Sequence, residues 1–185
     1  MAKAHDLMIT AHLPAGYLLS RGLKRPERLV MPAVLLGSIF PDFDFIFFLF
    51  VDHGAIHHHR YWVHIPLFWL VVSAVVLPLS WRSRAKWPVI GFLSAVFVHL
   101  FLDTIVGSIM WEAPFSTRLI SFFTLPRIHD VWLWNFVLHW TFLLEIVIWI
   151  AALTVLARTT GGFSSSVAWK RRPATGRPEH SLDAD

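Results

Sequence analysis

Long apolar runs dominate this chain, and polar residues interrupt them at few positions. Four runs occupy residues 29–51, 65–81, 87–111 and 131–157, and a shorter one occupies 7–19. A membrane-spanning helix needs about 17–25 mostly apolar residues, a length that all four long runs provide. The pattern predicts an all-α integral membrane bundle of four transmembrane helices plus a short N-terminal membrane-embedded helix. Whether that short helix spans or re-enters the membrane stays open.

Composition supports a membrane protein and predicts where its embedded part ends. Hydrophobic residues make up 56% of the chain and charged residues 15%, against about 45–50% and 25% in soluble domains. From Arg158 the chain turns to Gly, Ser, Pro and Arg, a composition typical of disorder. We therefore predict a single membrane-embedded domain over 1–157 and a disordered tail over 158–185. There is no cysteine, which excludes disulfides and thiolate metal sites.

The basic residues predict how the chain is oriented. With four spans, the side that carries loop 82–86 and the C-terminus holds all but three of the 16 lysines and arginines. The opposite side holds only Arg60, Arg118 and Arg127. Cytoplasmic loops are enriched in Lys and Arg, so we expect a multi-pass protein of the cytoplasmic membrane with a cytoplasmic C-terminus. The net charge of +4 then reflects topology, and we expect no nucleic-acid partner.

Four acids lie inside the predicted spans: Asp42, Asp44, Asp103 and Glu145. A charge at the centre of a bilayer costs at least about 2.5–3.5 kcal/mol, and such groups are usually paired or functional. The same spans contain no lysine or arginine, so the acids are either protonated or bound to a cation. Two histidines in these spans, His99 and His139, favour a bound cation.

The spacing of these residues suggests how a metal site forms. His99 and Asp103 are four residues apart and share one face of a helix. Pro41 interrupts its helix, and an irregular or extended chain after it would point Asp42 and Asp44 to one side. The alternative for this segment is a helix start, where acids favour the N-terminal dipole.

The HHHRYWVH stretch at 57–64 supplies more candidates in a loop predicted to lie outside the cytoplasm. His64 precedes Pro66 at a helix mouth, and His59 and Arg60 stand in the preceding loop. These groups and Asp103 can converge near the outer face, joined by His12 if the N-terminal helix enters the membrane. The alternative for the first two histidines of the run is a polar loop.

Three polar residues of the last predicted span receive lesser roles. Asn135 and His139, four apart, are candidate partners of the site residues, and Glu145 is a candidate for an interhelical hydrogen bond.

The order of motifs resembles the YdjM-like family of bacterial inner-membrane proteins. The resemblance rests on TAH, GSIFPDFD, HRYWVH and HLFLDTIVG, covers roughly residues 9–115, and departs from the family pattern at Val63 and Ile65. It implies a metal-dependent hydrolase of the inner membrane. The metal-site residues that it implies are His12, Asp42, Asp44, His59, His64, His99 and Asp103.

A wider resemblance to zinc-dependent phospholipase C and P1-type nucleases implies hydrolysis of a phosphoester. The expected partners are the lipid bilayer and a lipid-type phosphoester substrate at the outer half of the membrane. Histidine and carboxylate ligands suit a divalent metal, Zn first and Mn or Fe next, in unknown number. Arg60, Asp44 and His64 are the candidate catalytic residues, Arg60 because guanidinium binds phosphate oxygens bidentately. The alternatives are a structural or regulatory metal protein and an ion- or proton-coupled transporter.

Overall fold

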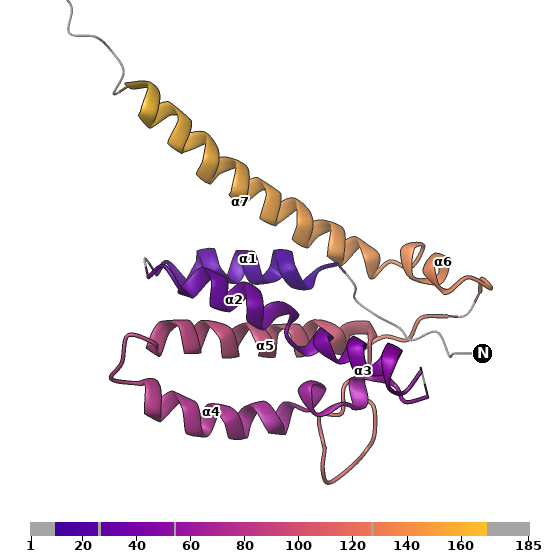
Figure 1. Ribbon diagram of the computed structural model, residues 1–185. Helices are drawn as coiled ribbons and strands as arrows, with labels where there is room; N and C mark the ends of the chain where they lie inside the picture. The colour runs from indigo at the N-terminus through magenta and orange to yellow at the C-terminus, as the bar shows by residue number, and fades with distance from the viewer. Residues whose placement is uncertain (1–9, 26, 54, 127, 170–185) are drawn as a thin grey trace, which may run out of the picture. The chain divides into compact units, whose positions relative to one another are not determined.

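The computed structural model describes residues 10–169 apart from 26, 54 and 127, and this part of the chain is helical (Figure 1). The helices are α1 (His12–Leu23), α2 (Val30–Ile39), η1 (Pro41–Phe43), α3 (Asp44–Phe50), η2 (His58–Arg60), η3 (Trp62–His64), α4 (Pro66–Ser80), α5 (Lys86–Val106), α6 (Trp132–Val137) and α7 (Phe142–Trp169). A single isolated bridge pairs Ile109 with Ile120, without forming a strand among the described residues. The all-α class is confirmed.

The apolar run at 29–51 forms a broken helix rather than a straight one. Proline has no backbone N–H and cannot continue α2, so the chain turns at Pro41. A 3₁₀ turn over Pro41–Phe43 follows, α3 starts at Asp44, and the two halves are bent by 50°. The interruption is where the sequence predicts it, but its form is a tight turn and not an extended segment.

Helix α5 is the centre of the packing and contacts α1, α2 and α4 (Figure 1). Its contact with α2 is close because of Gly37. A Cβ atom at that position would lie 2.3 Å from the backbone oxygen of Phe92. On the side of α4, Trp69 packs in a buried cluster with Leu93 and Val96. The close α2–α5 contact fixes the start of the broken segment relative to α5.

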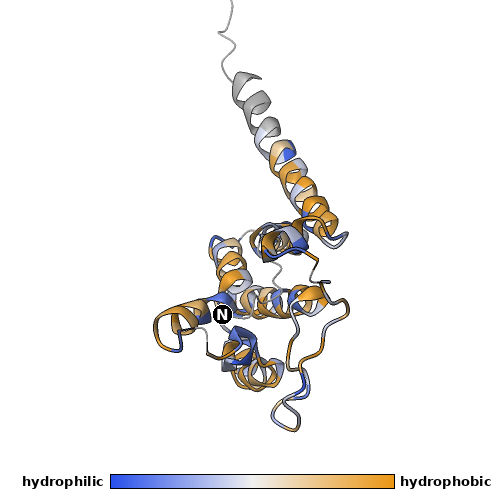
Figure 2. Cartoon of the chain, turned by 90° about the vertical axis from the view of Figure 1, so that its right-hand side faces the viewer, coloured by the Kyte–Doolittle hydropathy of each residue, from blue (hydrophilic) through white to orange (hydrophobic). Residues whose placement is uncertain are grey.

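The number of membrane spans is the part of the fold prediction that is not confirmed. Helices α5 and α7 are long and apolar enough to cross a membrane, and the bent α2–α3 pair counts as a third candidate. Helix α4 has 15 residues, or about 22 Å of helix, whereas the hydrocarbon core is about 30 Å thick. Apolar residues nevertheless follow most of each helix (Figure 2). Length and composition therefore support two or three membrane spans. The bundle of four transmembrane helices plus a short N-terminal membrane-embedded helix stays a prediction.

The predicted last span, 131–157, is divided between α6 and α7. Helix α7 exposes large apolar side chains such as Leu143, Val147 and Ile150, as a lipid-facing helix does. By its contacts the chain forms two compact units, Met1–Ala152 and Leu153–Asp185. The predicted boundary at 157 falls within α7, and residues 170–185 of the predicted tail lie outside the described residues. That boundary stays a prediction.

Candidate metal centre

Asp103 lies at the centre of a buried cluster of histidines. Its Oδ1 is 3.2 Å from Nε2 of His12. Its Oδ2 is 3.0 Å from Nε2 of His99, 3.5 Å from Nε2 of His64 and 3.6 Å from Nε2 of His59. The four imidazoles come from α1, η2, η3 and α5, and each is at most 3% exposed. Three regions far apart in the sequence, α1, the η2–η3 turns and α5, thus direct the same ring nitrogen at one carboxylate.

The other ring nitrogen of three of these histidines is held by a hydrogen bond. Nδ1 of His59 donates to the backbone oxygens of Gly107 and Ser108, at 2.5 and 3.1 Å. Nδ1 of His99 donates to the backbone oxygen of Ser38 at 2.8 Å. Such bonds fix the tautomer and the ring orientation of metal-binding histidines, leaving the Nε2 lone pair for the ion.

The two acids of the broken helix have different positions in the cluster. Asp44 is buried, and its Oδ2 accepts a hydrogen bond of 2.6 Å from Nδ1 of His64. This contact orients His64, so that its Nε2 faces Asp103. The Asp42 side chain is 30% exposed, and its Oδ1 lies 3.6 Å from Nε2 of His99. Asp42 is therefore the carboxylate of the cluster that is accessible from outside the protein.

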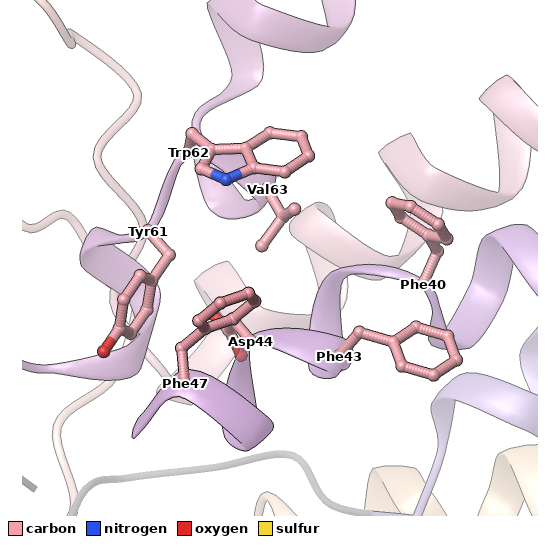
Figure 3. A pocket seen from close by; sticks show the side chains of 7 residues that line it. All are labelled: Phe40, Phe43, Asp44, Phe47, Tyr61, Trp62 and Val63. Carbon is pink, nitrogen blue, oxygen red and sulfur yellow. The ribbon is translucent and has the colours of Figure 1, made fainter. Parts of the chain in front are cut away.

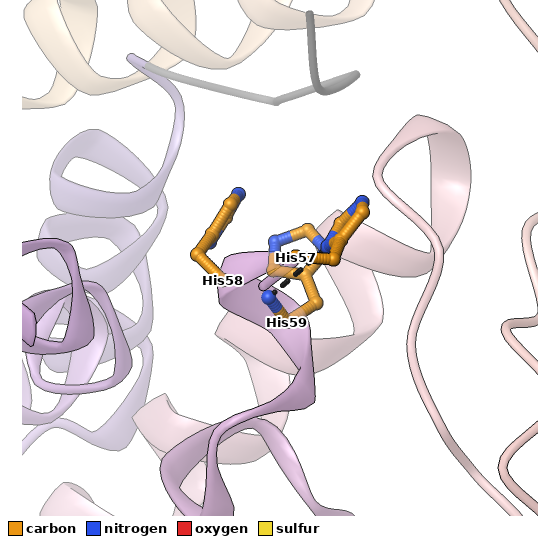
Figure 4. A group of neighbouring side chains, drawn as sticks. All are labelled: His57, His58 and His59. Carbon is orange, nitrogen blue, oxygen red and sulfur yellow. Dashed lines mark hydrogen bonds between the residues drawn. The ribbon is translucent and has the colours of Figure 1, made fainter. Parts of the chain in front are cut away.

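The HHH run divides its three rings between different contacts (Figure 4). Nδ1 of His57 accepts a hydrogen bond from the backbone N–H of His59 at 3.2 Å, which caps the 3₁₀ turn. His58 is fully buried, with Nδ1 3.9 Å from Oδ1 of Asp44. The polar-loop interpretation of these two residues does not fit a buried His58. Burial lowers the pKa of His58, so this ring is neutral.

The chemistry of the cluster fits a cation. Nε2 of His59, His64 and His99 and both oxygens of Asp103 are buried without a hydrogen bond among the described residues. In a neutral ring whose proton is on Nδ1, as in His59, the Nε2 lone pair faces the lone pairs of the Asp103 carboxylate. That juxtaposition is repulsive unless a positive charge lies between them, and buried unpaired polar atoms are costly.

The two loop histidines of the cluster differ in protonation. Burial lowers the pKa of His59 to about 3, so its ring is neutral and can donate a lone pair. Burial also acts to lower the pKa of His64, but the carboxylates of Asp103 and Asp44 outweigh it and raise that pKa to about 9. A metal would replace the proton that these carboxylates otherwise attract to His64.

The model of one protein family, described as YdjM inner membrane protein, matches residues 1–169. The chain belongs to this family. No curated protein and no solved structure matches the chain significantly. Membership in the YdjM family places the protein in the inner membrane, in agreement with its apolar helices. The more distant resemblance to zinc-dependent phospholipase C and P1-type nucleases stays a prediction.

All seven metal-site residues that the YdjM resemblance implies lie in one cluster. Possible ligand triplets include His12–His99–Asp103, Asp42–His64–His99 and His59–His64–Asp103, with the ligand atoms of each within 4.8 Å of one another. Their roles as ligands stay predictions. The sequence analysis missed Ser38, because a backbone carbonyl that orients His99 leaves no mark on the residue type.

The candidates of the last predicted span lie outside this cluster. Asn135 binds the backbone at His129, and Nδ1 of His139 lies 2.8 Å from the hydroxyl of Thr141. Buried Glu145 accepts hydrogen bonds from the Thr10 hydroxyl at 2.5 Å and the Thr10 N–H at 3.3 Å. This contact joins α7 to a residue before α1, which is not in a helix, so the interhelical hydrogen bond stays a prediction. Arg60 is exposed, one residue after His59.

Proposed function

We propose that the protein is a metal-dependent hydrolase of the inner membrane that acts on a phosphoester of a membrane lipid. The observation that carries the proposal is the convergence of four buried imidazole Nε2 atoms on Asp103, at 3.0 to 3.6 Å. Nitrogen and carboxylate ligands without thiolate suit Zn best, with Mn or Fe as alternatives.

The proposed ligands are the Nε2 atoms of the four histidines together with the Asp103 and Asp42 carboxylates. Asp44 holds His64 in place through the 2.6 Å hydrogen bond to Nδ1. When bound, the ion supplies Lewis-acid polarisation of the phosphoryl group and lowers the pKa of water toward neutrality. A catalytic site keeps one coordination position open, and half-buried Asp42 marks the side on which this centre is accessible.

Two residues of the chain contribute directly to the proposed reaction. Arg60, exposed beside His59, binds two oxygens of the phosphate with its guanidinium. The water oxygen forms a bond to phosphorus, and the bond from phosphorus to the alcohol oxygen of the lipid breaks. Asp42, the most exposed carboxylate of the cluster, accepts the proton of the attacking water. The departing alcohol oxygen takes up a proton from solvent, which balances the step.

The first experiment tests the metal. Protein purified in detergent without chelator should contain a transition metal, measured by inductively coupled plasma mass spectrometry. His99→Ala should remove most of it, because this ring faces both Asp42 and Asp103. His129→Ala is the matched control, since His129 is exposed and belongs to none of the ligand groups. Wild-type protein that holds no metal and takes up none would end the proposal.

The second experiment separates catalysis from a structural metal. A panel of phospholipids and isoprenoid phosphates is offered to wild type, Arg60→Ala and Arg118→Ala, the last an exposed arginine of the same predicted side. Loss of a charge-assisted hydrogen bond costs about 1.5–3 kcal/mol, so Arg60→Ala should lower kcat/KM about 10- to 150-fold with metal retained. Equal activity of the three proteins would remove the role of Arg60. Complete inactivity of metal-loaded wild type would favour a structural centre.

A further inference from the structure

An apolar pocket of about 340 Å³ adjoins the cluster of His and Asp side chains around Asp103, called the metal cluster below. Phe40, Phe43 and Phe47 form one wall; Phe40 lies between α2 and η1, Phe43 in η1 and Phe47 in α3. Tyr61, Trp62 and Val63 form the other. Figure 3 shows Trp62 and Val63 facing Phe43 and Phe47 across this space. Small-molecule sites usually enclose about 300–1,000 Å³ with mostly apolar linings. Its size and lining are those of a binding site.

The two polar residues that line the pocket are engaged by other side chains. The Tyr61 hydroxyl donates to Asp52, and the Asp44 carboxylate accepts from His64. The surface that remains toward the pocket is aromatic and aliphatic. Apart from the indole N–H of Trp62, this lining is apolar, so it favours a hydrocarbon chain over a ligand that requires several hydrogen bonds.

The two segments that form the walls of the pocket also contribute residues to the cluster. Phe43 stands between Asp42 and Asp44, and Val63 directly precedes His64. The pocket therefore ends at the cluster, and Asp44 takes part in both. Asp42 and Arg60 directly precede the pocket residues Phe43 and Tyr61 in the chain, so they are the polar groups that the polar end of a bound molecule would meet.

The outer rim of the pocket suits contact with lipid. The rings of Phe43, Phe47 and Trp62 are about half exposed, at 46%, 52% and 52%. The first two belong to the bent α2–α3 pair, which is apolar enough to cross a membrane. A hydrocarbon chain can thus enter this pocket from the bilayer without crossing water.

We propose that this pocket binds one hydrocarbon chain of a membrane lipid and positions the phosphate of that lipid at the metal cluster. The inference deepens the proposed function and rests on it for the role of the headgroup. A chain that moves from bilayer to pocket gains little hydrophobic free energy, because both surroundings are apolar. The pocket therefore selects and orients the substrate, and phosphates without a chain are expected to be poor substrates.

Binding is tested without any reaction, by photocrosslinking. The probe is a dodecyl phosphate with a diazirine at the end of the chain, added to detergent-purified protein and mapped by peptide mass spectrometry. We expect crosslinks within 40–47 and 61–63. Phe47→Gln should abolish most of them because a polar amide then lines the pocket. Phe50→Gln is the matched control: Phe50 is on the same helix, is 74% exposed and does not line the pocket. Retained metal shows that both variants are folded.

The contribution of the pocket to turnover is tested with alkyl 4-nitrophenyl phosphate diesters whose alkyl chains have two to eight carbons. For wild type, kcat/KM should rise with each methylene, by up to about 4-fold for complete burial from water. The rise should be smaller in Phe47→Gln and unchanged in Phe50→Gln. Partitioning into micelles is common to all variants, so the difference between slopes reports the pocket.

The two tests separate the pocket from the reaction. Crosslinks in the pocket that depend on Phe47 support the inference even if no diester is hydrolysed, in which case the proposed function alone fails. Crosslinks spread evenly over lipid-facing residues such as Leu70 of α4, and unaffected by Phe47→Gln, overturn the inference even if hydrolysis is observed.

Discussion

Replacement of Gly37 by alanine should disable the metal centre without touching any ligand. The new Cβ would lie 2.3 Å from the backbone oxygen of Phe92 and 3.0 Å from its carbonyl carbon. Ordinary van der Waals contact begins near 3.4 Å, and backbone atoms cannot rotate away as a side chain does. Helices α2 and α5 must therefore separate by about 1 Å at this point.

The separation acts on the next residue of α2. The backbone oxygen of Ser38 accepts the hydrogen bond from Nδ1 of His99 at 2.8 Å, and an increase of about 1 Å exceeds the range of a hydrogen bond. Loss of a group that orients a metal-binding histidine lowers metal affinity about 10- to 100-fold. Overpacking of the helix contact should also lower the free energy of unfolding by about 1–3 kcal/mol.

The assay is metal affinity, by competition with a chelator, together with thermal unfolding in detergent. Gly22→Ala provides the control, because a Cβ at Gly22 in α1 meets no atom within 4 Å. It should bind metal as wild type does and unfold at the same or a higher temperature. A folded Gly37→Ala protein with wild-type metal affinity would refute the idea that the α2–α5 contact holds His99 in position.

Two further predictions concern α7 and the orientation in the membrane. Glu145→Ala leaves the hydroxyl and N–H of Thr10 without their acceptor and should lower the free energy of unfolding by about 1–3 kcal/mol, measured by thermal unfolding. Glu145→Gln keeps an acceptor and should retain most of that free energy. Equal losses in the two variants would show that the charge of Glu145 matters more than the hydrogen bonds. A reporter after Arg84 should read cytoplasmic and one near His57 or Thr117 extracytoplasmic, because the four-span prediction puts 13 of the 16 basic residues on the first side. Opposite labelling would move the cluster to the cytoplasmic face.

Much of the candidate centre could be predicted because its residues are expensive in a membrane. Asp103 and His99 stand out as polar groups in an apolar run, and their spacing of four fixes a common helix face. The break at Pro41 could be predicted for an equally local reason, the missing backbone N–H. The division of the last run into α6 and α7 could not, because apolar composition continues through the break.

Other features depend on contacts between distant segments. No local pattern indicates that Ser38 offers its carbonyl to His99, 61 residues away, or that Asp44 orients His64 while Asp42 remains half exposed. The pocket beside the cluster is equally invisible in the sequence, where Phe43 and Trp62 are only two more aromatic residues in apolar surroundings.

The sequence by itself determined the helical class, the membrane setting and the set of polar residues, because each follows from local composition, periodicity and the cost of burying charge. Only the tertiary structure decided which nitrogen of each histidine faces Asp103, which acid is partly exposed and where the apolar pocket lies. Those properties follow from the close packing of α2 on α5 at Gly37 and from the folding of the HHHRYWVH turns toward α5, contacts that no single segment specifies.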